Sequence, residues 1–158
     1  MIDLNAAVGR WPFVAGWAER VEELAAAMTD AGVTQAHVSA VEAVLAPDPL
    51  AATQRVCDSL AGHERLVPAG VVDPMLRTAE ADLRRLVSSW PVRLVKLYPG
   101  FGGYSAEDDR VAGIVQAAGA EGVLTAVVMR LEDDRNQHRV MRVESVGTDA
   151  VTSLATKV

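Results

Sequence analysis

The sequence has few of the features that mark secreted, membrane-spanning or nucleic-acid-binding proteins. Its one cysteine, Cys57, has no second cysteine with which to form an internal disulfide. No apolar run approaches the roughly 18 residues of a membrane span, and the first residues carry neither region of a signal peptide. The net charge is −6, whereas binding to nucleic acid needs a basic surface. These absences predict a soluble, cytoplasmic protein that binds neither membranes nor nucleic acids.

The motifs of three large groups of enzymes and nucleotide-binding proteins are also missing. No Gly-x-Ser-x-Gly occurs, which argues against a serine hydrolase. No Gly-x-Gly-x-x-Gly follows a strand-like segment, which argues against a Rossmann dinucleotide site. The glycine-rich segment 99–104 is not followed by Gly-Lys-Ser/Thr, so it is not a P-loop.

Strand-like and helix-like segments alternate along the whole chain. Apolar, strand-like segments are predicted at residues 2–5, 34–40, 65–72, 92–97 and 123–129. Apolar residues at helical spacing predict a helix after each of the first four segments, and residues 148–157 are expected to form a last short helix. Because the connections are mostly short, this pattern predicts one α/β domain over residues 1–158 with parallel strands and right-handed crossovers.

The pattern leaves two α/β architectures open. A complete (β/α)8 barrel typically needs about 250 residues. The chain has 158 residues, which suits an open parallel sheet of five strands. The pattern alone therefore favours the open sheet.

Four segments in series resemble a known family. They are Ile-Asp-Leu-Asn-Ala-Ala-Val-Gly ending at Gly9, Val-Asp-Pro ending at Pro74, Val-Lys-Leu-Tyr-Pro ending at Pro99, and Asp-Arg-Asn-Gln-His ending at His138. Their order and spacing resemble the amidohydrolase-related family, often called amidohydrolase family 2, over about residues 1–155. The resemblance implies a (β/α) TIM-barrel fold of which this chain holds about five βα units of eight, so that the domain is C-terminally incomplete. It also implies a hydrolase or carboxy-lyase that acts on a small carboxylated or cyclic substrate.

The same resemblance implies a zinc ion, but the matching positions do not hold zinc ligands. The family's paired histidines on the first strand correspond to Asn5 and Ala7, and its histidine at the end of the fifth strand corresponds to about Arg130. An amide is a poor zinc ligand, alanine has no donor atom, and a guanidinium repels a cation. We therefore expect no metal and no other cofactor.

Strand alternation predicts a polar cluster without a metal. Asp3, Asp73, Lys96 and Arg130 fall near strand ends that converge in a barrel. In a functional interpretation, Lys96 or Arg130 holds a substrate carboxylate, and Asp73 acts as a base or orients the lysine. In the alternative interpretation, these charges only pair with one another at the strand ends.

Further candidates lie beside this cluster. Trp11 in the first loop is expected either to cover a ligand or to plug the rim, and His138 is a candidate acid–base residue in the loop after the fifth strand. The predicted catalytic residues are Asp73, Lys96, Arg130 and His138, and the predicted substrate-binding residues are Asn5, Arg10, Trp11, Tyr98 and Arg135.

The edge strands of a partial barrel carry unpaired backbone N–H and C=O groups, which tend to pair with another chain. We therefore expect self-association. A non-catalytic, truncated or degenerate barrel that self-associates or binds a small anion is the alternative to the enzyme.

Overall fold

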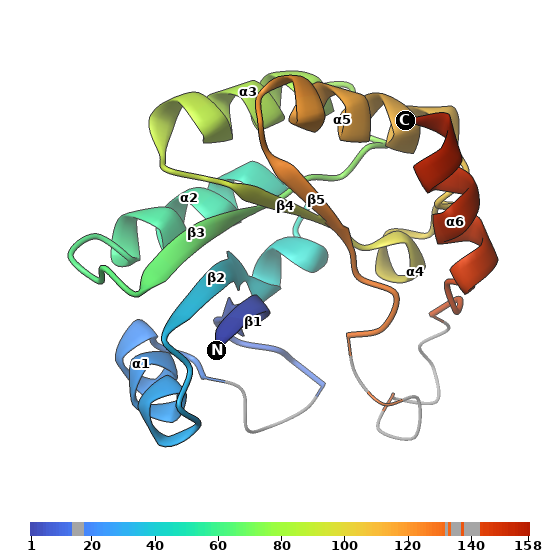
Figure 1. The fold of residues 1–158 in the computed structure, drawn as a ribbon. Coiled ribbons are helices and arrows are strands. Elements are labelled where there is room, and N and C mark those ends of the chain that lie inside the picture. Colours follow the sequence, from blue (N-terminus) through green and yellow to red (C-terminus); the bar gives the residue numbers. More distant parts are fainter. Residues whose placement is uncertain (14–17, 132, 134–136, 138–142) are drawn as a thin grey trace.

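A curled, parallel, five-stranded sheet forms the centre of the computed structural model (Figure 1). The structure describes residues 1–13, 18–131, 133, 137 and 143–158. The strands lie in sequence order and are β1 (Ile2–Val8), β2 (Gln35–Ala40), β3 (Leu66–Val71), β4 (Leu94–Leu97) and β5 (Leu124–Val127).

Helices follow the strands, and the longer ones lie along one face of the curled sheet (Figure 1). They are α1 (Val21–Asp30), the 3₁₀ helix η1 (Val41–Val44), α2 (Pro49–Ser59), α3 (Ala79–Ser89), α4 (Pro99–Gly102), α5 (Asp109–Ala120) and α6 (Thr148–Lys157). The predicted parallel α/β fold is confirmed, as a half-barrel sheet with interleaved helices. The sheet is open at β1 and β5 within the described residues, so an open parallel sheet also fits this architecture.

Local signals set several of the element boundaries. Asp48 caps α2: its carboxylate accepts a hydrogen bond from the backbone N–H of Ala51 at 3.0 Å, and Pro49 follows at the first helical position. At α5 the cap is Asp108, which accepts from the N–H of Arg110 at 2.9 Å. In the turn before α5, the Ser105 hydroxyl accepts from the N–H of Glu107.

The helix-covered face of the sheet holds most of the core. Leu83 and Leu86 of α3 pack with Val95 and Leu97 of β4, and residues of α5 join the same cluster. Cys57 belongs to this cluster, and burial raises the pKa of its thiol to about 11, in agreement with a structural role. Each fully buried leucine of this kind stabilises the fold by about 1.5–3 kcal/mol. Because Val95 and Leu97 face the helices, the alternating residue Lys96 faces the concave side of the sheet.

No helix within the described ranges reaches the length and apolar character of a bilayer span.

Candidate functional site

Lys96 crosses the concave side of the sheet and joins β4 to the far strands. Its side chain is 0 % exposed. The Nζ atom donates to the backbone carbonyl of Ala6 on β1 at 2.8 Å and to the Ser39 Oγ on β2 at 3.1 Å. The pairing of β1 with β2 shifts register between Asp3 and Ala6, so Lys96 contacts β1 where its ladder is irregular. The lysine therefore satisfies a buried carbonyl and links strands that are not neighbours.

The Lys96 amine is buried without a carboxylate beside it. Among the described residues no ion pair includes Lys96. Burial lowers its pKa to about 8, and the negative charge of Asp3 opposes that shift only in part. The predicted association of Asp3 with Lys96 is thus a longer-range electrostatic one.

This buried amine is expected to make stability rise with pH. In the unfolded chain Lys96 keeps its proton until about pH 10.5, whereas in the folded chain it releases the proton near pH 8. The unfolded state then binds more protons, so the free energy of unfolding increases by roughly 1 kcal/mol between about pH 8 and pH 9. Above about pH 9 the raised pKa of Cys57 acts in the opposite direction. Urea unfolding across this window, compared with the Lys96→Met variant, measures the effect, and an equal slope in both proteins would contradict it.

Tyr98 follows the end of β4, two residues after Lys96, and lies at the C-terminal edge of the sheet. Its ring is buried, and burial raises its pKa to about 12, while hydrogen bonding with Ser39 opposes the shift. The Ser39 Oγ thus accepts from Lys96, and Tyr98 lies near the same hydroxyl. We call Lys96, Ser39 and Tyr98 the Lys96 cluster.

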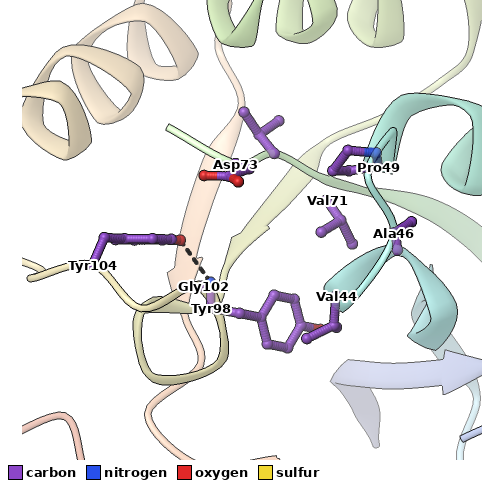
Figure 2. Close-up of a pocket in the computed structure, with 10 residues that line it drawn as sticks. Val44, Ala46, Pro49, Val71, Asp73, Tyr98, Gly102 and Tyr104 are labelled. Carbon is purple, nitrogen blue, oxygen red and sulfur yellow. Dashed lines mark hydrogen bonds between the residues drawn. The ribbon is translucent and has the colours of Figure 1, made fainter. Parts of the chain in front are cut away.

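A small cavity lies at this edge, beyond the ends of β3 and β4 (Figure 2). It measures about 30 Å³, enough for one water molecule. Asp73 and Tyr104 line it together with Tyr98 and Gly102, and Figure 2 shows the Asp73 carboxylate and the Tyr104 hydroxyl on the same side. The backbone N–H of Tyr98 donates to the Tyr104 Oη at 3.0 Å. Burial, and to a lesser degree the charge of Asp73, raises the pKa of Tyr104 well above its usual range.

A larger cavity follows the end of β5. It measures about 280 Å³ and is lined by Phe101, Met129, Arg130, Leu131, Gln137, Val143, Glu144, Ser145 and Val146. Its volume is close to the lower limit for small-molecule sites. The lining carries one cation, Arg130, and one carboxylate, Glu144. Arg130 is the group of this cavity that can bind a small anion.

The first loop contributes an apolar plug. Trp11 is buried and makes edge-on contacts with Phe13 and Phe101, at ring-centre distances of 5.3 and 5.4 Å. It also packs against Ala7 and Val41. Trp11 therefore belongs to an apolar cluster, and its two predicted roles stay predictions.

Two other predicted residues, Arg10 and Asn5, have exposed side chains. Arg10 is exposed and forms an ion pair with Glu19 at 3.8 Å. Asn5 is exposed, and its backbone N–H donates to Asp3 Oδ1. Arg135 and His138 lie outside the described residues.

The structure therefore joins Lys96 to Ser39 by a hydrogen bond, and it places Asp73 and Tyr98 in the lining of the same small cavity. No hydrogen bond or ion pair of the described residues links Lys96 to Asp73 or to Arg130. Sequence reasoning missed Ser39 and Tyr104. A polar residue within the apolar segment 34–40 was the available signal for Ser39.

The described residues contain no group of three or more His, Cys, Asp or Glu side chains placed to hold a metal ion. No protein-family model and no curated protein matches this chain in sequence comparison. The relation to the amidohydrolase-related family therefore stays a prediction from the four motifs.

Proposed function

We propose that the chain binds a small carboxylated or cyclic compound at the C-terminal edge of its sheet and acts on it as a hydrolase or carboxy-lyase of the amidohydrolase type, without a metal. In this proposal the curled sheet is the first part of a (β/α) barrel, in which active sites lie at this edge. The observation that carries the proposal is the cavity of about 280 Å³ at the end of β5, lined by Arg130. A guanidinium can bind a carboxylate through two parallel hydrogen bonds, which fixes its orientation as well as its position.

Asp73 is the proposed acid–base residue. It follows β3 at the same edge, and one of its oxygens already accepts the N–H of Met75 at 2.8 Å, which holds the carboxylate in place. In hydrolysis, Asp73 would take a proton from the attacking water and return it to the leaving group. In carboxy-lyase chemistry, the C–C bond to the substrate carboxylate breaks and carbon dioxide leaves. The protonated carboxyl group of Asp73 would then give its proton to the carbon that keeps the electron pair.

Two variants separate binding from chemistry. Binding of small mono- and dicarboxylic acids is measured by calorimetry, and turnover by release of carbon dioxide or of hydrolysis product. Arg130→Gln is expected to weaken binding by at least about 10-fold, because it removes a charge-assisted pair. Asp73→Asn is expected to keep binding but to lower turnover by about 10²–10⁴-fold.

The matched control is Arg85→Gln on the exposed surface of α3. It should change neither the affinity for carboxylic acids nor the turnover. Equal binding by the wild type, Arg130→Gln and Arg85→Gln would refute the anion site.

A non-catalytic role is the second candidate, and the Lys96 cluster favours it. Lys96 is completely enclosed, with both of its hydrogen bonds made to the protein itself. The cavity beside Asp73 has room for only about one water molecule. Binding that depends on Arg130, with no turnover of any carboxylic acid or cyclic amide, would support a small-anion binder.

A further inference from the structure

Among the described residues, the two edge strands of the sheet lack the usual protection against pairing. In natural proteins, charged residues, proline or covering segments prevent the edge strands of a sheet from pairing with other chains. β5 has the sequence Leu-Thr-Ala-Val and carries no charge, and β1 carries a single charge at Asp3. Neither strand has a pairing partner on its outer side in the described part of the chain. Both therefore present backbone groups without a strand partner, in β1 mainly along residues 2–5, because Ala6, Ala7 and Val8 are buried and the Ala6 carbonyl accepts from Lys96.

Exposed apolar side chains gather at the same two edges. Eight large apolar side chains are exposed among the described residues, and five of them lie on or next to β1 and β5: Met1, Ile2, Leu4, Leu124 and Met129. Leu4 is 50 % exposed and Leu124 is 63 % exposed. Side chains of this kind, concentrated along unprotected edges, mark an interaction surface.

We propose that a second copy of this chain covers both edges, with β1 of each copy pairing in parallel with β5 of the other. All five strands are parallel and lie in sequence order. A two-fold rotation about an axis along the strands keeps every strand in the same direction. It places β1 beside the partner's β5 and, at the same time, β5 beside the partner's β1. A copy of the chain offers both complementary edges at once, and the assembly closes as a dimer instead of growing into a fibre.

The charge distribution is consistent with a second copy as the partner. Two copies with a net charge of −6 repel each other overall, but β5 is uncharged and β1 carries only Asp3, so the joined edges bring few like charges together. The partner would also close the concave side of the sheet, where Lys96 and Ser39 lie. This association is independent of the reaction proposed above, because it rests on the edge strands alone.

The native mass of the wild type and of three lysine variants tests the proposal. Light scattering coupled to gel filtration is expected to give twice the 16.8 kDa of one chain. Leu4→Lys and Leu124→Lys should each raise the dimer dissociation constant by at least about 100-fold, because an unpaired ammonium would be buried at the joint. Leu45→Lys is the matched control, because Leu45 is similarly exposed, at 45 %, but follows η1 and belongs to neither edge strand. It should leave the dissociation constant within about 3-fold.

Cysteine pairs test which edges meet. A Leu4→Cys chain mixed with a Leu124→Cys chain is expected to form a mixed disulfide dimer under mild oxidation, in preference to either self-linked dimer. Cys57 is buried and does not compete. A monomer at all concentrations, an open-ended polymer, equal weakening by Leu45→Lys, or preferential self-linking of the Leu4→Cys chain would each overturn the proposal. Circular dichroism of each variant confirms that the fold is retained.

Discussion

Replacement of Lys96 by alanine is expected to lower the free energy of unfolding by about 3–5 kcal/mol at pH 9. The substitution removes a completely buried four-carbon stem and leaves a cavity at the centre of the concave face. It also leaves the Ala6 carbonyl without its donor at 2.8 Å and weakens the connection of β4 to β1. At pH 9 the wild-type amine, with a pKa of about 8, is largely neutral, so the loss is not masked by relief of a buried charge.

Urea unfolding followed by circular dichroism measures this loss. Lys96→Met keeps most of the apolar stem and removes only the donor, so it should cost about 1–2 kcal/mol. Arg93→Ala, at an exposed position just before the same strand, should stay within about 0.5 kcal/mol of the wild type. At pH 7 the cost of Lys96→Ala should be smaller, because the variant no longer buries a charge there. A loss below about 1 kcal/mol at pH 9 would show that the lysine does not hold the sheet together.

Gly102→Ala is expected to cost roughly 2–4 kcal/mol and to disrupt the small cavity at the end of β4. A Cβ atom at this position would lie 2.2 Å from Cε1 and 2.6 Å from Cδ1 of Tyr104. The ring must therefore move, and the hydrogen bond from the buried N–H of Tyr98 to the Tyr104 hydroxyl is lost. The cost combines overpacking with an unpaired backbone donor.

A double-mutant cycle identifies the cause of the Gly102→Ala effect. Tyr104→Ala removes the ring against which the new methyl group collides, so the cost of Gly102→Ala should fall to below about 1 kcal/mol in that background. Gly113→Ala is the matched glycine control, because nothing lies within 4 Å of a Cβ built there in α5. It should stabilise the protein by about 0.5–1 kcal/mol through helix propensity. Additive costs for Gly102→Ala and Tyr104→Ala would contradict the proposed collision.

Local chemistry made most of the secondary structure predictable. Apolar alternation and helical spacing act between near neighbours in sequence, so the five strands and the main helices lie where they were predicted. The errors concern boundaries and caps. β1 extends through Val8, beyond the predicted residue 5, because parallel pairing with β2 continues to Val8. The short helix α4 after Tyr98 was read as a glycine-rich loop.

The candidate site was less predictable, because its contacts join residues that are distant in sequence. Lys96 was predicted from the sequence to belong to a polar cluster with Asp3, Asp73 and Arg130, but its two hydrogen-bond partners lie 90 and 57 residues away, at Ala6 and Ser39. Curling of the sheet, together with the irregular pairing of β1, places these groups opposite Lys96, and a pattern along one strand cannot report either feature.

The sequence by itself determined that this protein is an α/β chain of alternating elements and indicated Lys96 as part of a polar cluster, because apolar periodicity sets the elements and a charge needs polar partners. Only the tertiary structure decided that Lys96 binds Ala6 and Ser39 and not Asp73, and that the unprotected strands β1 and β5 form the edges of the sheet. These outcomes depend on how far the sheet curls and on which strands become neighbours, and both are set by packing between elements far apart in the chain.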